Sequence, residues 1–501
     1  MDAFNDSALS AYFPGLVDIC QGEDGQLVYA IRKDDELIFA HEYNTETESF
    51  GIPERIHLPF TIPRATEVMR YFSQNDDALY DDLLTYLKRF SGLDDEQWAI
   101  VVHYIFLTYL HDHSGIDYCG YLLFYAVPER GKSRTGKSVT YVAFRGIHLV
   151  ELREATIFRY SQNLRGTLFL DLLDVSKKAE RGGCDDILLQ RAEKGAKCVR
   201  VLKPDLGPFK DTVYFEIYGP TIFASNEQLH NILDTRCLPI IMPNRPGNYE
   251  NPRPELGLEL KERLTAFRAK HLTTPFTEPE PIDGISGRLW DLAKPMFFVN
   301  SLLPVDASIL IDSILSIAGE KDDSRKDSLE GRLVAIIKEI TDEGGLGRFV
   351  EWSIKTGDIR NRFNQGKPID KHVSPQWIGK RLKSMSFNNR IVHGYSEIKI
   401  TADEYALILK QYGLTQRESA LSPNSLPDKA EQHQHVLREV ESGRESAQVR
   451  GGQSTFNSPE EKEVYLAKLN ELKETGGLTR DEMERLAMEA VGQWGQNDLP
   501  F

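Results

Sequence analysis

A glycine-rich stretch that follows an apolar run constrains the fold of this chain more than any other feature. Residues 131–138 read Gly-Lys-Ser-Arg-Thr-Gly-Lys-Ser and match the pattern G-x-x-x-x-G-K-S at every fixed position. The apolar run Tyr121–Val127 precedes the stretch as a buried strand would, and Lys137–Phe144 follows it as a helix. A loop between a strand and a helix can turn its backbone N–H groups toward phosphate groups, and the helix N-terminus adds its positive end. The sequence therefore predicts an α/β domain that binds a nucleotide.

Each residue of this loop has an expected place around the nucleotide. Eight residues would surround the phosphates: Gly131, Lys132, Ser133, Arg134, Thr135, Gly136, Lys137 and Ser138. Lys137 would neutralise the β- and γ-phosphates, and the hydroxyl of Ser138 would be a ligand of Mg²⁺. ATP and Mg²⁺ are therefore the expected cofactors, and ATP hydrolysis is the expected chemistry.

An acidic residue closes a later apolar run, where a nucleotide site needs a second ligand for the metal. The run Thr167–Asp171 ends in a carboxylate, so Asp171 is expected to bind Mg²⁺ through water, although it could also merely end a strand. A glutamate usually follows such an aspartate and polarises the attacking water, but Leu172 stands there. Asp174, or Glu180 further along, is the nearest substitute for that catalytic base.

Two further polar residues follow in the order that a hydrolytic site requires. Asn226 ends the apolar run Pro220–Asn226 and could orient the water against the γ-phosphate. Arg236 could reach the γ-phosphate of a neighbouring subunit, because a planar guanidinium suits phosphate oxygens. Taken alone, the two residues would be a helix cap and a surface ion pair. Their order after the glycine-rich loop favours the functional interpretation.

The series from the loop through Leu168–Asp171 and Ala224–Asn226 to Thr235–Cys237 resembles an AAA+-type ATPase core. More narrowly, it is similar to the helicase-like ATPases of phages and integrative mobile elements, which are relatives of the superfamily-three and poxvirus-type primase-helicases. The likeness covers about residues 55 to 300 and extends more weakly to 413. The resemblance implies a ring, often a hexamer, with nucleotide between subunits, and a working set of Lys137, Ser138, Asp171, Asn226 and Arg236. Leu172 departs from the family pattern and leaves the base and the rate of hydrolysis in doubt. Primer synthesis is not implied, because no acidic primase centre stands before residue 95.

Composition and pattern divide the chain into five expected parts. They are an α+β region of unknown role (1–95), the ATPase core with a mostly parallel sheet (96–275), a helical extension (276–345), a winged helix (346–413) and a flexible linker with two short helices (414–501). The β-type runs assigned to the core include Cys198–Leu202 and Thr212–Ile217. The proline-rich segment Thr273–Pro281 marks the end of the core.

Residues 346–413 are predicted to be helix, helix, helix, hairpin, helix, and they resemble a winged helix-turn-helix. Ser374 is a good N-cap for the helix Ser374–Met385, and Gly394 lies between two β-like runs as the tip of a wing. The fold places its third helix in the DNA major groove. The expected DNA contacts are Lys371, Lys380, Arg381, Lys383 and Arg390. A winged helix can equally be a protein-docking module, and that alternative stays open.

Overall charge and composition exclude some other classes of protein. The net charge of −16 argues against a protein that coats nucleic acid with its whole surface, although one domain can still carry a basic face. The longest apolar stretch, Ala99–Leu110, is too short to span a bilayer, and the N-terminus lacks the pattern of a signal peptide. The five cysteines are scattered without metal-ligand spacing, which favours reduced thiols and a cytoplasmic location.

The leading hypothesis is an ATP-dependent DNA helicase or translocase that acts in replication of a phage or mobile element. The basic run Lys194–Arg200, with Lys203, is a candidate for the loop that grips the strand. The tip Asn497–Phe501 resembles the terminal peptide of bacterial single-stranded-DNA-binding proteins and could recruit replication or repair partners through Phe501, or it could be an unstructured end. Two alternatives remain: an ATPase that loads or remodels protein partners, and a nucleotide-gated DNA-binding protein with little turnover.

Overall fold

A five-stranded parallel sheet forms the centre of the fold in the computed structural model, which describes residues 8–414 except 47, 173–174, 228, 230, 344–350 and 393–394. Its strands are β7 (Tyr121–Tyr125), β8 (Ile147–Leu149), β9 (Leu168–Asp171), β12 (Thr221–Ser225) and β13 (Cys237–Ile241), in the order β13-β7-β12-β9-β8. All four neighbouring pairs are parallel, so all five strands end at one edge. The mixed α/β class and the mostly parallel sheet expected for the core are confirmed.

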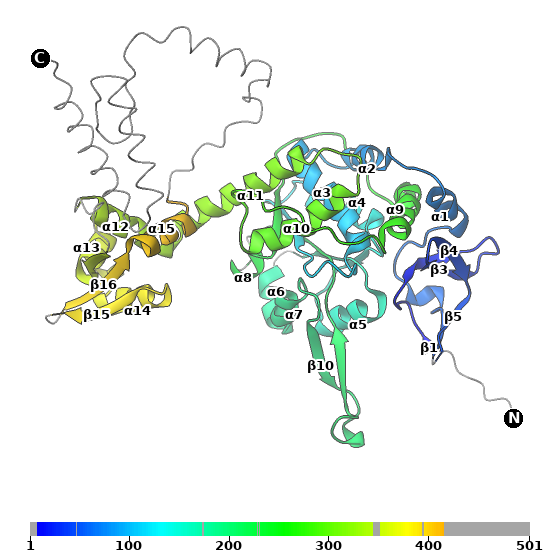
Figure 1. Cartoon of the computed structure of the whole chain (residues 1–501), viewed down its shortest axis with the longest axis horizontal. Helices are drawn as coiled ribbons and strands as arrows, with labels where there is room; N and C mark the ends of the chain where they lie inside the picture. The colour runs from blue at the N-terminus through cyan, green and yellow to red at the C-terminus, as the bar shows by residue number, and fades with distance from the viewer. Residues whose placement is uncertain are drawn as a thin grey trace, which may run out of the picture. The chain divides into compact units, whose positions relative to one another are not determined.

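Helices cover both faces of this sheet, because alternate strand side chains point to opposite sides. Leu122 and Phe124 of β7 belong to one core, and Tyr121 and Leu123 belong to the other. The first core includes α3 (Asp95–Leu110), α4 (Lys132–Val142), α10 (Arg288–Ser301) and α11 (Ser308–Asp327). The second includes α5 (Glu154–Leu164), α6 (Val175–Gly182) and α7 (Asp185–Gln190), and Figure 1 shows this arrangement. The hydrophobic core thus continues past residue 275 into the helices expected to form a separate extension.

The N-terminal residues also share the central core. They form the antiparallel sheet β2 (Leu16–Gln21), β3 (Leu27–Lys33) and β4 (Glu36–Ala40), the short strands β1 (Ala8–Leu9), β5 (Glu42–Asn44) and β6 (Ser49–Gly51), and the helices α1 (Ala65–Phe72) and α2 (Leu79–Lys88). The antiparallel sheet packs on α9 (Leu258–His271), and a buried ion pair joins Asp18 of β2 to Arg145 at 2.7 Å. No break in packing therefore marks residue 95.

Two of the runs expected in the parallel sheet lie outside it. Strands β10 (Lys197–Val201) and β11 (Thr212–Glu216) pair with each other in an antiparallel hairpin that extends away from the central sheet (Figure 1). Their exposed side chains explain this placement: Val199 and Tyr214 face each other across the hairpin and are both exposed, whereas β12 at the centre of the parallel sheet is buried throughout.

A separate hydrophobic core holds the C-terminal described residues together. The module contains α12 (Leu329–Glu343), β14 (Glu351–Lys355), α13 (Thr356–Asn364), α14 (Pro375–Ser384), β15 (Asn388–Val392), β16 (Tyr395–Thr401) and α15 (Ala402–Gln411). Its antiparallel sheet has the order β14-β16-β15. The module therefore begins at α12, before residue 346. The predicted order of three helices before the hairpin differs from the described residues, in which Glu351–Lys355 is strand β14: Trp352 and Ile354 point inward, and the strand pairs with β16.

The N-cap predicted at Ser374 is confirmed, because its hydroxyl accepts a hydrogen bond from the Trp377 N–H at 3.2 Å. At the start of α15, Thr401 and Glu404 form a reciprocal capping box. The linker, the two short helices and the Phe501 tip lie outside the described residues. Within the described part of the chain, no helix is long and apolar enough to cross a bilayer.

Candidate nucleotide site

Helix α4 begins at Lys132, five residues earlier than the sequence pattern suggested. Gly131 is its N-cap with φ +84°, a backbone conformation that suits glycine. The loop that joins β7 to this helix is therefore Ala126–Arg130, and the helix N-terminus points its free N–H groups from residues 131 to 134 into the loop.

Lys132 lies buried in this loop. Its Nζ donates hydrogen bonds to the carbonyl oxygens of Ala126 at 2.7 Å and Val127 at 2.8 Å. Burial lowers the pKa of the Lys132 ammonium, and the nearby Asp171 carboxylate opposes that shift. A lysine held over a loop by two carbonyl oxygens can release them for phosphate oxygens, which carry more negative charge.

Ser133 connects the helix to the acidic strand. Its Oγ donates to Oδ1 of Asp171 at 2.9 Å, and Asp171 is the last residue of β9. The hydroxyl and the carboxylate are oxygen ligands of the kind that Mg²⁺ prefers, and two protein ligands leave room for phosphate and water. Among the described residues no group of three His, Cys, Asp or Glu side chains could hold a metal by itself. The pair therefore fits a metal that arrives with a nucleotide.

A cavity of about 620 Å³ opens around these residues. Its lining consists of Pro128, Glu129, Arg130, Gly131, Lys132, Ser133, Arg134, Asp171, Leu172, Ala224 and Asn226. The structure thus brings together the loop, the acidic strand end and the asparagine that the sequence singled out. Strand β12 lies between β7 and β9, which places Asn226 between the loop and Asp171.

The predicted positions of Lys137 and Ser138 in this site are wrong. Both residues lie in the second turn of α4, and neither lines the cavity. Ser138 is buried, and its Oγ donates to the Thr135 carbonyl within the helix at 2.8 Å. Gly136 packs against the ring of Phe169, where a Cβ would come within 2.2 Å of Cζ. This glycine therefore permits helix-to-sheet packing and does not shape a phosphate loop.

The reason for the error is a repeat in the sequence. Gly-Lys-Ser occurs at residues 131–133 and again at 136–138, and Ala126 can stand in the first position of the same pattern when the loop is read five residues earlier. Thr135 also turns away from the site, because it is buried and its Oγ1 donates to the Gly131 carbonyl at 3.0 Å.

The remaining predicted catalytic residues differ in their placement. Leu172 is buried and lines the cavity, and Asp174 lies outside the described residues. Glu180 is exposed on α6 and is not part of the cavity wall. Of the two expected substitutes for the catalytic base, the one that the structure describes, Glu180, therefore does not line the cavity.

Arg236 lies at the opposite edge of the sheet from the loop. Its carbonyl accepts a hydrogen bond from the N–H of Tyr121, the first residue of β7, whereas the loop follows the last residue of that strand. Its Nη1 donates to the Ile232 carbonyl at 3.0 Å. Arg236 thus does not contribute to the cavity of its own chain.

His148 is a neighbour of the site that the sequence did not reveal. Its Nε2 lies 3.9 Å from Oδ2 of Asp171, and its ring stacks on Phe169 with centroids 5.0 Å apart. Burial and the charge of Lys137 lower the pKa of His148, so the ring is neutral near pH 7. A lone histidine in a three-residue strand carries no pattern that could have marked it.

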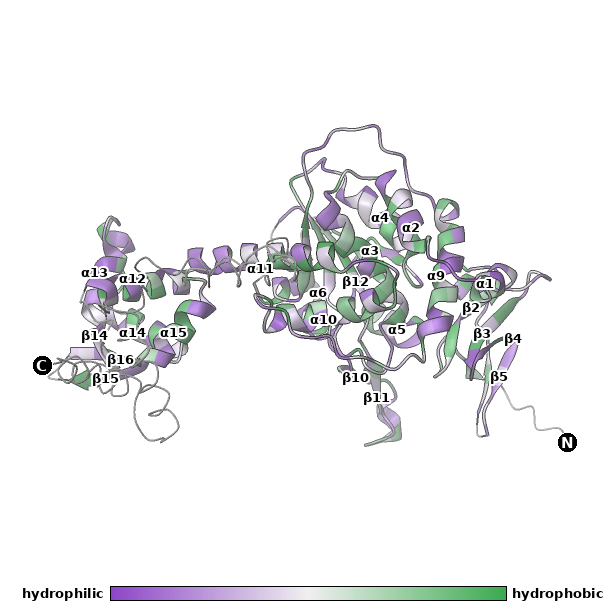
Figure 2. Cartoon of the chain, turned by 45° about the horizontal axis from the view of Figure 1, so that its top comes forward, coloured by the Kyte–Doolittle hydropathy of each residue, from purple (hydrophilic) through white to green (hydrophobic). Residues whose placement is uncertain are grey.

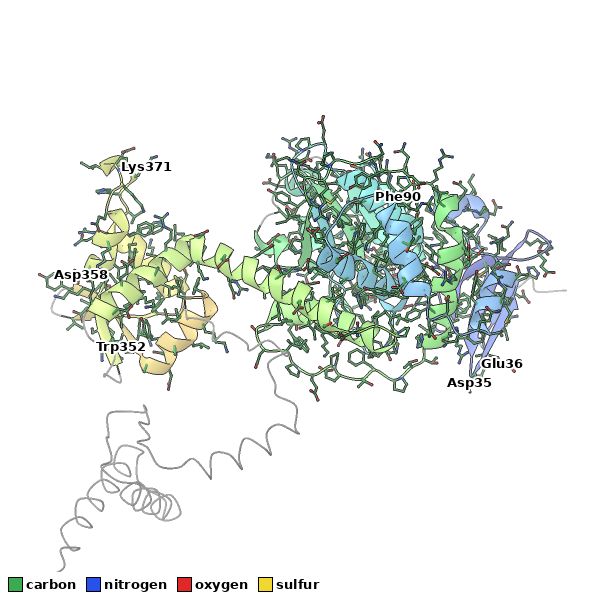
Figure 3. The ribbon with its side chains drawn as sticks, turned by 90° about the horizontal axis from the view of Figure 1, so that it is seen from above. Asp35, Glu36, Phe90, Trp352, Asp358 and Lys371 are labelled. Atoms are coloured by element: carbon green, nitrogen blue, oxygen red, sulfur yellow. The ribbon has the colours of Figure 1, made fainter. Side chains whose placement is uncertain are left out.

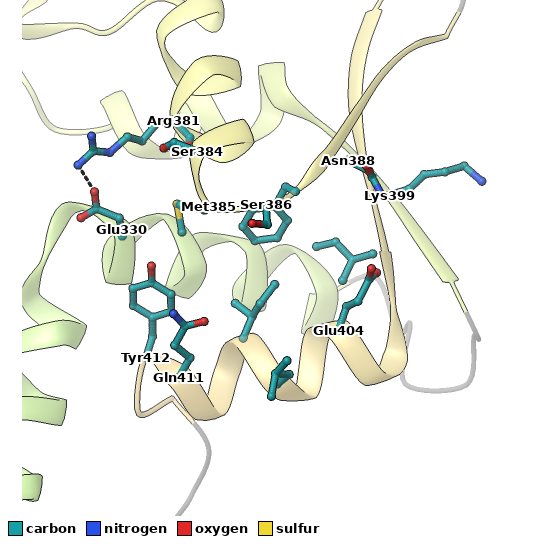
Figure 4. A pocket seen from close by; sticks show the side chains of 14 residues that line it. Glu330, Arg381, Ser384, Met385, Ser386, Asn388, Lys399, Glu404, Gln411 and Tyr412 are labelled. Atoms are coloured by element: carbon teal, nitrogen blue, oxygen red, sulfur yellow. Dashed lines mark hydrogen bonds and ion pairs between the residues drawn. The ribbon is translucent and has the colours of Figure 1, made fainter. Parts of the chain in front are cut away.

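The five basic residues predicted to contact DNA, Arg381 included, are all exposed, but one of them has an acidic partner. Lys371, Lys380, Lys383 and Arg390 are exposed. Arg381 forms an ion pair with Glu330 of α12, beside the pocket shown in Figure 4. Arg381 therefore braces the module.

The basic side chains of Lys194–Arg200, predicted to bind a DNA strand, already form hydrogen bonds or ion pairs within the chain. Lys194 donates to three carbonyl oxygens, including that of His113 at 2.6 Å. Lys197 pairs with Glu216 at 3.0 Å, and Arg200 pairs with Glu154. Lys203 remains exposed near the hairpin tip. The tip itself, rather than the basic run, is the accessible part of this segment.

Comparisons with known proteins add two distant structures. Neither a protein-family model nor a curated protein sequence matches the chain. An apo structure of the NrS-1 C-terminal region, in its A form, is 11% identical with a TM-score of 0.31, and the match covers 77% of this chain and 97% of that one. A structure of SCCmec type IV Cch as an active helicase is 11% identical with a TM-score of 0.33, and the match covers 80% of each chain. At these TM-scores the function has to be argued from the residues of this chain.

Proposed function

We propose that this chain binds ATP with Mg²⁺ at the N-terminus of α4 and hydrolyses it. The observation that supports this most strongly is the hydrogen bond of 2.9 Å between Ser133 Oγ and Asp171 Oδ1, directly beside the buried Lys132. A hydroxyl, a carboxylate and an ammonium group at one helix N-terminus meet the needs of a metal-bound triphosphate.

Each of these groups has a separate task in the proposed site. Lys132 would exchange its two carbonyl partners for phosphate oxygens, and Ser133 and Asp171 would hold Mg²⁺, which offsets the charge of the phosphates. Asn226, at the end of the intervening strand, would orient the attacking water.

The test is a matched pair of lysine variants. Lys132→Ala should abolish ATP hydrolysis and weaken ATP binding at least tenfold, because it removes the charge that meets the phosphates. Lys137→Ala should keep both near the wild-type level, because Lys137 lies outside the cavity. The reverse result, with loss only in Lys137→Ala, would contradict the proposed site.

We further propose that ATP turnover drives movement along DNA, as in a helicase or translocase, in replication of a phage or mobile element. The hairpin of β10 and β11 supports this proposal. Along the chain it lies between β9, which ends at Asp171, and β12, which leads to Asn226. A change at the phosphates can therefore move both ends of the segment that carries the hairpin.

The hairpin tip has the chemistry of a single-strand contact. Phe209 is 98% exposed, and the ammonium groups of Lys203 and Lys210, which lie on either side of it in the sequence, have no partner among the described residues. An exposed ring can stack on a base of any sequence, and lysines can meet the phosphates. Figure 2, coloured by hydropathy, shows hydrophilic and hydrophobic residues together at the end of this hairpin.

The C-terminal module would supply a second DNA contact. The order α12, β14, α13, α14, β15, β16 supports a winged helix in which α14 is the third helix. Gln376, Lys380 and Lys383 share an exposed face of α14, while Ile378 and Leu382 are buried. Lys371, which Figure 3 labels, and Arg390 are exposed in the same module.

A ring of subunits would complete the proposed motor. Arg236 lies at the opposite edge of the sheet from the cavity of its own chain, so it would serve the site of a neighbouring subunit. Displacement of a tailed duplex with ATP supports the helicase. DNA-stimulated hydrolysis without displacement would favour a loader or remodeller, and nucleotide-dependent DNA binding without turnover would favour a gated binder.

A further inference from the structure

A second cavity lies on the other side of the phosphate loop. It measures about 210 Å³ and shares Glu129, Arg130, Gly131 and Arg134 with the larger cavity. The rest of its lining comes from residues 90–92, residues 242–247 and Tyr249. If Lys132 and Ser133 hold a triphosphate, this second cavity lies beside it. The nucleoside attached to the α-phosphate can then reach into the cavity.

The walls of this second cavity suit a planar base. Phe90, labelled in Figure 3, and Met242 are buried and apolar. The ring of Tyr249 forms another wall, and the guanidinium of Arg134 lies over that ring at 5.9 Å from its centroid. Apolar, aromatic and guanidinium surfaces stack well on heteroaromatic rings.

The segment that carries Tyr249 is fixed across the cavity at both ends. Arg245 forms an ion pair with Asp94, and Arg89 donates two hydrogen bonds to Glu250 at 3.0 and 2.8 Å. The backbone N–H of Glu250 also donates to the Arg89 carbonyl at 3.0 Å. Residues 242–250 therefore form a held strap.

Two glycines make room for the Tyr249 side chain under this strap. A Cβ on Gly92 would come within 2.1 Å of the Tyr249 Oη, and a Cβ on Gly247 would come within 2.9 Å of its Cε2. The close fit indicates that the Tyr249 ring is held in a single position, as a preorganised stacking surface must be.

Glu129 stands where the two cavities meet. It has φ +68°, an uncommon conformation for a residue with a side chain, and it lines both cavities. Within the described part of the chain its carboxylate has neither a hydrogen bond nor an ion pair. A free carboxylate beside bound phosphates is unfavourable unless the ligand offers it hydrogen-bond donors. Strain of this kind is found at functional sites, where another interaction compensates for it.

We infer that the second cavity holds the nucleoside of the bound nucleotide, with Glu129 accepting hydrogen bonds from the ribose 2′- and 3′-hydroxyls. This assignment rests on the proposed nucleotide site. The ribose is the part of the ligand between the α-phosphate and the base, so it lies at the junction where Glu129 lies. The site then selects ribonucleoside triphosphates over 2′-deoxyribonucleoside triphosphates.

The test compares ATP with 2′-deoxy-ATP on the full chain by equilibrium binding. Wild type should bind ATP about tenfold or more tightly than 2′-deoxy-ATP, since a hydrogen bond to a charged group is lost. Glu129→Gly, which suits the positive φ, should bind both nucleotides equally and bind 2′-deoxy-ATP no worse than wild type does. Equal affinities in wild type, or a preference that survives in Glu129→Gly, would overturn the ribose contact.

A second comparison tests the base cavity. Tyr249→Ala should weaken ATP binding about tenfold and leave binding of inorganic tripolyphosphate unchanged. Equal loss for both ligands, or no loss for ATP, would overturn the assignment of this cavity to the base. Wild type that binds neither ATP nor tripolyphosphate would instead refute the proposed nucleotide site, so the two failures are distinguishable.

Discussion

Removal of the aromatic ring at the tip of the β10–β11 hairpin should weaken DNA binding and leave the stability of the fold unchanged. Phe209 is 98% exposed, so Phe209→Ala removes almost no buried apolar surface. The free energy of unfolding should therefore change by no more than about 0.5 kcal/mol. The Phe209 ring therefore contributes little to folding and is free to contact a ligand.

The expected loss of DNA affinity follows from stacking. One base on one aromatic ring contributes about 1–3 kcal/mol, which corresponds to an affinity change of about 5- to 150-fold. Phe209→Trp keeps a stacking surface and should bind as well as wild type. The assay is fluorescence anisotropy of a labelled single-stranded oligonucleotide at one fixed salt concentration, together with urea unfolding of the same variants.

A control variant and a second hairpin variant show whether the effect is specific to the hairpin. Ile56 is 82% exposed on another part of the chain, so Ile56→Ala removes a similar apolar group and should leave DNA binding unchanged. Replacing Lys203 and Lys210 together with alanine should reduce the salt slope of binding by about 1.4, since each lysine meets one phosphate. An affinity for Phe209→Ala within twofold of wild type would refute the proposed strand contact.

The remaining predictions concern stability. Asp18→Asn should lower the free energy of urea unfolding by about 3–5 kcal/mol, because it leaves the buried Arg145 without a counter-charge. Glu151→Gln, in an ion pair with Arg153 in which both side chains are exposed, should cost less than about 1 kcal/mol, and similar losses in both variants would contradict the buried bridge. Burial lowers the pKa of His111 to about 4, so the unfolded chain takes up this proton more readily and stability should fall as pH drops from about 6.5 toward 4, by roughly 2 kcal/mol at pH 5. His111→Gln should flatten this part of the pH profile and the exposed His57→Gln should not; an unchanged profile in both variants would be evidence against a neutral buried His111.

The sequence predicted which segments form the candidate site and in what order, but it placed the phosphate loop five residues too late. The apolar runs before and after the loop, the aspartate at the end of β9 and the asparagine after β12 all carry local patterns, and the parallel sheet brings them to one edge. The choice between two overlapping Gly-Lys-Ser patterns depends on where the helix starts. That start follows from tertiary packing: Gly136 must lie against Phe169, and Lys132 finds carbonyl oxygens in the loop.

Two other features were hidden from the sequence for a related physical reason. A β-type run does not say which strand it pairs with, so β10 and β11 looked like members of the central sheet. The counter-charges of Arg200, Lys197 and Arg381 lie on other elements, so a run of basic residues looked more available than it is. Both are long-range contacts, which a local pattern cannot encode.

The N-terminal sheet, which had no assigned role, packs on α9, and α9 in turn holds one end of α4. The last carbonyls of this helix need donors, and Tyr109 supplies one to Val142 at 2.8 Å while Lys261 supplies another to Ala143 at 2.8 Å. Lys261 belongs to α9, on which the N-terminal sheet packs, and its cation favours the negative end of the helix. The buried Asp18 reaches the same end of the helix through Arg145. Because the other end of α4 carries the proposed phosphate site, the N-terminal sheet and α9 brace the helix against which a nucleotide would bind.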